Sequence, residues 1–129
     1  MASIFTRIIQ GEIPCHKIAE NDDFIAFLDI TPVAVGHTLV IPKKEVDHFF
    51  DLDDQLLRDI NLFAKDVAAK LQRAVPCRRI GVAIIGLEVP HAHVHLVPLN
   101  TMKDINFSAE RVQMTQDELA ELATKIRQA

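Results

Sequence analysis

The stretch Val89–Pro98, VPHAHVHLVP, places three of the six histidines of this chain at alternate positions. Successive side chains of a β-strand point to opposite faces, so His91, His93 and His95 would share one face and the apolar residues between them the other. In a helix, His93 would point away from the other two. The seven residues between the two prolines are few for a helix, and the valines favour a strand. The stretch therefore predicts a strand with a row of imidazoles on one surface.

The rest of the chain is typical of short strands joined by turns, with few helices. Apolar spacing predicts a helix that ends at Gly11, a long helix that is capped by Asp51 or Asp53 and runs to about Ala74, and a final helix that opens with a Thr115–Glu118 capping box. Further strands are predicted at 15–20, 24–29, 37–43 and 79–86. Hairpin-like links between most strands indicate an α+β fold with an antiparallel sheet.

The composition is that of a globular protein. With 129 residues, 49% hydrophobic and 25% charged, we expect one domain spanning 1–129. The net charge of −4 offers no basic patch, so we expect no nucleic acid polymer as partner. The amino-terminal stretch has no apolar run long enough for a signal peptide or a membrane span. Cys15 and Cys77 are expected to be free thiols in a reducing compartment, which indicates a cytoplasmic protein.

Three aligned imidazoles have three interpretations. They could be buried histidines satisfied by polar partners, although each ring needs such a partner and adjacent positive charges repel. They could bind zinc, copper or nickel, with His37 or Glu88 as a further ligand, but the spacing is not the helical H-E-x-x-H pattern. They could also perform nucleophilic catalysis on phosphorus, because a neutral imidazole is a competent nucleophile near neutral pH.

The run His91–Val97 has the form H-φ-H-φ-H-φ-φ, which resembles the signature of the histidine triad (HIT) family. The resemblance extends over most of the chain, because IFTRIIQGEIP (4–14) and FIAFLDITPVAVGHTLVIPKK (24–44) are also similar to segments of that family. It implies a HIT fold: a five-stranded antiparallel sheet with one long helix and shorter flanking helices. It also implies a homodimer in which the strand RIGVAIIG (79–86) pairs with its copy across a two-fold axis.

The resemblance further implies a hydrolase that attacks the α-phosphate of nucleoside phosphoramidates or dinucleoside polyphosphates. A covalent nucleotidyl–histidine intermediate forms, and water then releases the nucleoside monophosphate; no cofactor and no metal are implied. By position, His93 would be the nucleophile and His95 would contact the phosphate or the leaving group. His91 would support the nucleophile, with His37 as a further hydrogen-bonding partner. The alternative is a low-turnover nucleotide-binding or interaction protein of the same fold.

The resemblance also assigns the nucleotide pocket. Asp29 falls where the family holds the ribose hydroxyls, which a carboxylate can accept from. Apolar side chains could form the wall of the base pocket, namely Ile4, Phe5, Ile8, Phe24 and Phe27.

Two departures from the family pattern concern the loop before the triad and a metal site. Many members carry G-Q-[ST]-V-x-H, whereas this chain has Leu87 and Glu88 in place of the glutamine and the hydroxyl residue. A carboxylate accepts hydrogen bonds and repels phosphate, so Glu88 either opposes ordinary phosphoramidase activity or is a solvated charge at a strand end.

Bacterial-type relatives often hold a structural zinc ion through an amino-terminal C-x-x-C, a later histidine and the first triad histidine. Here the corresponding residues are Ser3, Thr6 and Glu45, and His48 is out of register. Since thiolates make such a site tight, the sequence predicts no structural zinc.

Overall fold

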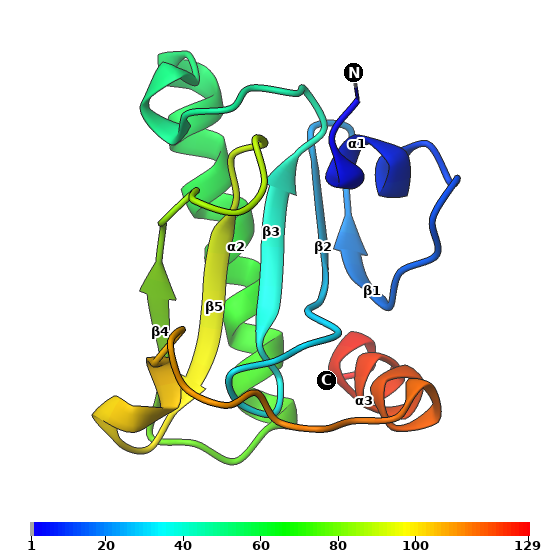
Figure 1. The fold of residues 1–129 in the computed structure, drawn as a ribbon, viewed down its shortest axis with the longest axis vertical. Helices are drawn as coiled ribbons and strands as arrows, with labels where there is room; N and C mark the ends of the chain where they lie inside the picture. Colours follow the sequence, from blue (N-terminus) through cyan, green and yellow to red (C-terminus); the bar gives the residue numbers. More distant parts are fainter. Residues whose placement is uncertain (1) are drawn as a thin grey trace.

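A computed structural model describes residues 2–129 and contains a five-stranded antiparallel sheet flanked by helices. The strands lie in the order β1-β2-β3-β5-β4, so β3 and β5 are interior strands and β4 forms an edge (Figure 1). This confirms the predicted α+β class and the five-stranded antiparallel sheet with one long helix and shorter ones. The strands are β1 (Lys17–Glu20), β2 (Phe24–Leu28), β3 (Thr38–Pro42), β4 (Arg79–Ala83) and β5 (Val94–Leu99), and the helices are α1 (Ile4–Ile9), α2 (Asp54–Ala74), α3 (Gln116–Arg127) and the short 3-10 helices η1 (Phe49–Asp51) and η2 (Met102–Ile105).

The helices begin and end at the residues that local chemistry favours. The Asp53 carboxylate accepts from the backbone N–H of Leu56, which makes Asp53, rather than Asp51, the N-cap of α2. Thr115 and Glu118 form the predicted capping box of α3. Gly11 follows α1 with φ +81°, a backbone conformation that glycine adopts without strain. Within residues 2–129, no helix combines the length and apolar character needed to cross a bilayer.

The histidine-bearing strand starts later than the sequence predicts. Only His95 lies within β5, since His93 lies just before this strand and His91 lies at the end of a bend that spans 87–91. The backbone leaves the sheet there because the Ala92 N–H donates to the carbonyl of Val46, in a neighbouring loop, at 2.7 Å. All three imidazoles are nevertheless buried on one side of the sheet, where the Phe5 ring packs against His91 and His93 and the ring centroids of His93 and His95 lie 4.8 Å apart.

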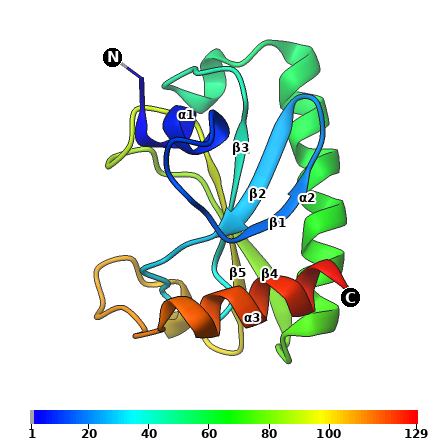
Figure 2. The ribbon, with the colours of Figure 1, turned by 90° about the vertical axis from the view of Figure 1, so that its right-hand side faces the viewer.

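Helices α2 and α3 cover one face of the sheet, and α1 covers part of the other (Figure 2). The larger core lies under α2 and α3 and includes Val94 and Leu96, the apolar residues that alternate with the histidines. Phe24 also packs in this core, where its ring centroid lies 5.6 Å from that of Phe63. Phe24 therefore does not belong to the wall of a pocket on the histidine face, which corrects that expectation.

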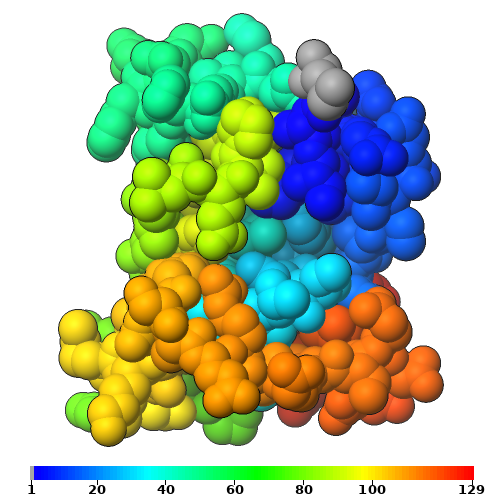
Figure 3. Space-filling view, in the orientation of Figure 1, coloured from blue at the N-terminus to red at the C-terminus, as the bar shows by residue number. Residues whose placement is uncertain are grey.

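The smaller core fixes α1 over the histidine face. Phe5 from α1 packs there against the side chains of β2 and β3 that point away from α2, namely Ile25, Phe27, Leu39 and Ile41. Since α1 has only six residues, it covers only a part of that face. The remainder lies open between the loop after β4 and the segment after η2, where Figure 3 shows a hollow.

Candidate active site

The hollow on the histidine face is a cavity of about 480 Å³. Its lining is mostly apolar and comes largely from α1, β2 and β3, and it also includes His93, His95 and two carboxylates, Asp29 and Glu88. Four of the five side chains expected to form the base wall line this cavity: Ile4, Phe5, Ile8 and Phe27. An apolar cavity with a few convergent polar groups has the form of a small-molecule site.

His93 is held with one ring nitrogen free to react. Its Nδ1 lies 2.7 Å from the carbonyl oxygen of His91. A carbonyl oxygen only accepts, so Nδ1 carries a hydrogen, and in the neutral ring Nε2 keeps its lone pair. The edge of the Phe5 ring packs against the imidazole at a centroid distance of 5.1 Å, which limits its rotation. The neutral ring of His93 therefore has a defined tautomer and a fixed orientation, which are the properties that a nucleophilic imidazole requires.

His91 is fully buried and is bound through both ring nitrogens. Its Nε2 donates to the carbonyl oxygen of Pro42 at 2.7 Å, so its Nδ1 accepts the hydroxyl hydrogen of Ser3 at 2.8 Å. Burial lowers the pKa of His91, which favours the neutral ring. The carbonyl that orients His93 is thus fixed by a residue held on both sides.

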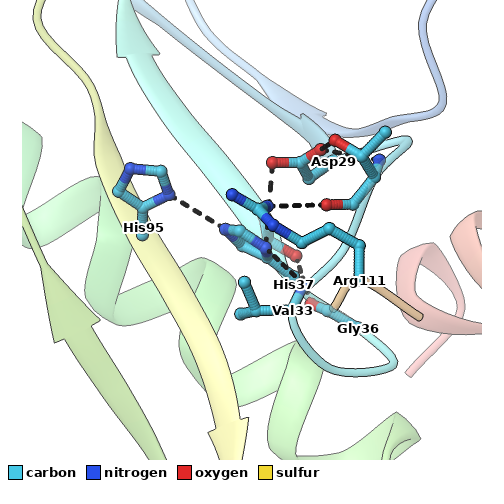
Figure 4. A network of polar contacts seen from close by, with 8 residues as sticks. Asp29, Val33, Gly36, His37, His95 and Arg111 are labelled. Atoms are coloured by element: carbon cyan, nitrogen blue, oxygen red, sulfur yellow. Dashed lines mark hydrogen bonds and ion pairs between the residues drawn. The ribbon is translucent and has the colours of Figure 1, made fainter. Parts of the chain in front are cut away.

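His37 and His95 form a second pair with defined tautomers (Figure 4). The Val33 N–H donates to Nδ1 of His37 at 3.1 Å, so the His37 hydrogen is on Nε2 and is donated to Nδ1 of His95 at 2.9 Å. His95 must then carry its own hydrogen on Nε2. Burial is the main cause that lowers the pKa of His37 to about 4 and that of His95 to about 3. Both rings are therefore neutral near pH 7.

Asp29 lies directly after β2, at the edge of the cavity. Its Oδ1 accepts from the backbone N–H of Thr31 at 2.8 Å and from the Thr31 hydroxyl at 3.1 Å. Its Oδ2 lies 3.7 Å from Nδ1 of His37, beyond hydrogen-bonding distance. One oxygen is therefore used to fix the carboxylate, and the other accepts no hydrogen bond within the described residues.

Leu87 and Glu88, the residues that depart from the family pattern, lie in the loop between β4 and β5. Glu88 is exposed but lines the cavity, and Leu87 is 88% exposed. Because β4 ends at Ala83, Glu88 belongs to the cavity mouth rather than to the end of a strand.

The positions that correspond to the zinc ligands of bacterial-type relatives form a hydrogen-bonded cluster. Besides the bond from Ser3 to His91, the Glu45 carboxylate accepts from the Ser3 N–H at 2.7 Å and from the Thr6 hydroxyl at 2.6 Å. The bond from the Ser3 N–H is the main cause that lowers the pKa of Glu45 to about 2. This cluster does not fit a structural zinc ion, because it contains no thiolate and its two hydroxyls, carboxylate and imidazole are already hydrogen-bonded to each other. In the part of the chain that the structure describes, no three His, Cys, Asp or Glu side chains form a group that could hold a metal ion. His48 lies outside the cluster, with a side chain that is 79% exposed.

The structure adds residues that the sequence did not single out. Phe107, Ser108 and Arg111 line the cavity from the segment between η2 and α3. This segment has no regular secondary structure and no periodic apolar pattern, so the sequence gives no signal that it approaches the histidines.

The fold and the site together define an α+β protein with four hydrogen-bonded histidines beside an apolar cavity. The HIT domain family model matches residues 10–102. An adenosine 5′-monophosphoramidase of Schizosaccharomyces pombe is 37% identical over 103 residues, which are 76% of this chain and 74% of that protein. The chain therefore belongs to the HIT family.

Solved structures share the fold over nearly the whole chain. A Hit-like protein from Bartonella henselae has a TM-score of 0.84 at 33% identity, covering 98% of this chain and 95% of that one. A Zn-bound histidine triad family protein from Mycobacterium smegmatis has a TM-score of 0.83 at 25% identity, covering 99% of this chain and 92% of that one.

Proposed function

We propose that this protein is a nucleotide hydrolase that attacks the α-phosphate of nucleoside phosphoramidates or dinucleoside polyphosphates. The observation that carries the proposal is that two imidazole nitrogens at the cavity, Nε2 of His93 and Nε2 of His95, have complementary roles in hydrogen bonding. The hydrogen bonds of His93 leave its Nε2 with a lone pair, and those of His95 leave its Nε2 with a hydrogen. A nucleophile beside a hydrogen-bond donor is what displacement at phosphorus requires. The family match and the phosphoramidase relative support the same reaction class.

In the proposed reaction, Nε2 of His93 forms a bond to the α-phosphorus while the bond from phosphorus to the leaving group breaks. His95 donates a hydrogen bond from Nε2 to a phosphate oxygen or to the leaving group. Asp29 accepts from the ribose hydroxyls, and Phe5, Ile8 and Phe27 contact the base. Water then cleaves the phosphorus–nitrogen bond, which releases the nucleoside monophosphate and restores His93.

The second candidate is a nucleotide-binding or interaction protein with weak turnover. Glu88 favours it, because a carboxylate at the cavity mouth opposes the entry of an anionic substrate. The fold and the ligand pocket are the same in both cases, and only the rate of phosphorus chemistry differs.

One experiment separates the two candidates. The protein is mixed with adenosine phosphoramidate or diadenosine polyphosphate, turnover is measured, and the acid-labile adenylyl adduct is sought by mass spectrometry. The hydrolase proposal expects turnover and an adduct on His93, and it expects His93→Ala to lose both while AMP binding stays measurable. Near wild-type kcat in His93→Ala would refute the assignment of the nucleophile. Binding of AMP without turnover or adduct in the wild type would support the second candidate.

We also propose that the protein is a homodimer joined through β4. This strand is an edge of the sheet and exposes Val82 (60%), with Ile84 and Ile85 exposed just after it. An apolar edge strand invites association, and pairing with its own copy across a two-fold axis closes it. Light scattering at micromolar concentration is expected to give the mass of two chains, and a strictly monomeric species would contradict the proposal.

A further inference from the structure

The cavity has an unusual charge balance for a site that would take a phosphate. Among the described residues that line it, two are carboxylates, Asp29 and Glu88, and Arg111 is the only lysine or arginine. His95 and the neighbouring His37 are held neutral by burial, so they supply no positive charge near pH 7. Among these residues, Arg111 is therefore the side chain with a permanent positive charge that can face an anionic ligand.

Arg111 is fixed close to the reacting histidines. Its Nη1 donates to the carbonyl oxygen of Thr31 at 2.8 Å, two residues after Asp29. Its guanidinium carbon lies 5.7 Å from the ring centroid of Phe107, a cation–π contact. Phe107 in turn packs edge-on against His95, with ring centroids 4.7 Å apart. The guanidinium is thus held by the loop after β2 on one side and by Phe107, which packs against His95, on the other.

Arg111 also retains donors for a ligand. A guanidinium has five N–H donors, and only the bond to the Thr31 carbonyl is formed within the described residues. Figure 4 draws Arg111 together with Asp29, His37 and His95, the residues around the predicted ribose and phosphate positions. Its charge contributes to lowering the pKa of both His37 and His95, as expected for a cation that is close to each ring.

We infer that Arg111 binds the phosphate of the bound nucleotide and is a specificity-determining residue contributed by the segment that follows the triad. This inference rests on the proposed function, since it names a contact of the same nucleotide site. The HIT family model ends its match at residue 102, so the contact comes from a part of the chain that the family match does not include. The Val112 N–H donates to the Pro32 carbonyl at 2.8 Å, which holds this segment against the loop after β2.

The test compares the binding of AMP and of adenosine by calorimetry, because the two ligands differ only in the phosphate. Arg111→Gln is expected to weaken AMP binding by about tenfold or more and to leave adenosine binding unchanged, since a charge-assisted hydrogen bond to phosphate is lost. The salt dependence of AMP binding should also fall in this variant. Arg111→Lys keeps the charge but not the planar fork, so it should recover part of the affinity. Lys65→Gln removes a charge from α2, on the opposite face of the sheet, and should bind AMP like the wild type.

The outcomes are distinguishable. AMP affinity that is unchanged in Arg111→Gln overturns the inference and leaves the proposed function standing. An equal loss of AMP and adenosine affinity also overturns it, because the residue would then only support the shape of the pocket. A wild-type protein that binds neither ligand overturns the proposed function, and this inference with it.

Discussion

Acidification from pH 7 to pH 5 is expected to destabilise this protein, because His37 and His95 are buried as neutral rings. An unfolded histidine has a pKa of about 6.5, so at pH 5 the unfolded chain binds protons at both positions. In the folded protein the pKa values are about 4 for His37 and about 3 for His95, so neither ring is substantially protonated at pH 5. The unfolded state therefore binds more protons, and the free energy of unfolding falls as the pH falls.

The size of the effect follows from the unfolded state. Between pH 7 and pH 5, a histidine of pKa about 6.5 that is protonated only when unfolded costs about 2 kcal/mol, and two cost about 4 kcal/mol. The pKa of His91 is lowered in the same direction and adds to the loss. Glu45, whose pKa is lowered to about 2, stabilises the fold above pH 4.5 and loses this contribution only at lower pH, outside the range. Since small domains have only about 5–15 kcal/mol in total, this loss would be a large fraction of the stability of the protein.

The assay is urea unfolding at pH 7, 6 and 5. Besides the wild type we would measure His37→Gln, in which the amide nitrogen can still donate toward Nδ1 of His95 but one titrating group is gone. Its loss of stability between pH 7 and pH 5 should be smaller by about 2 kcal/mol. His48→Gln, at an exposed histidine, should keep the wild-type pH dependence. A free energy of unfolding that is flat over this range, or an unchanged pH dependence in His37→Gln, would show that these rings are not buried as neutral groups.

Three further predictions concern the rim of the site and its support. Glu88→Ser should raise kcat/KM for adenosine phosphoramidate by roughly tenfold, or about 1.4 kcal/mol, because a carboxylate at the cavity mouth repels the substrate. Glu121→Gln, which removes a carboxylate from α3, is the control, and unchanged kinetics in Glu88→Ser would mean that Glu88 contacts only solvent. Fold and activity should persist in excess chelator, and stoichiometric zinc by elemental analysis with unfolding on its removal would contradict this. Ser3→Ala removes both the N-cap of α1 and the donor to His91, so the free energy of unfolding should fall by about 1–2 kcal/mol, and an unaltered urea midpoint would refute that role.

The histidine face could be predicted because it rests on local rules. Alternation predicts that His93 and His95 share a face, and their ring centroids lie 4.8 Å apart. His91 lies in a bend before β5 and reaches the same side through its packing against Phe5, which also contacts His93. The caps Asp53 and Thr115 follow from the same kind of rule, since a side-chain oxygen satisfies backbone donors two or three residues away.

The wrong assignment of Phe24 has a different origin. Phe24 and Phe27 are both apolar and lie on one strand, but three residues apart they point to opposite faces. The alternation rule applied to β2 separates them, whereas apolar character alone does not. Arg111 could not be found in this way, because its position depends on an irregular segment whose path is set by long-range bonds to Thr31 and Pro32.

The directions of the hydrogen bonds connect the proposed catalysis to the acid sensitivity. A backbone carbonyl accepts from His93, and a backbone N–H donates to His37, so the main chain at two separate places determines which ring nitrogen of each neutral histidine carries the hydrogen. A proton added to His95 would put a hydrogen on Nδ1, opposite the one that His37 already donates, and the bond between the rings would be lost. Burial is the main reason why the pair resists protonation, and the direction of this hydrogen bond, which also keeps a donor at Nε2 of His95, acts in the same sense. Two carboxylates and a bound phosphate would favour protonated imidazoles, so a site that uses neutral imidazoles must keep their pKa values low. The consequence is that the free energy of unfolding falls at acid pH, where the unfolded chain takes up protons at these histidines.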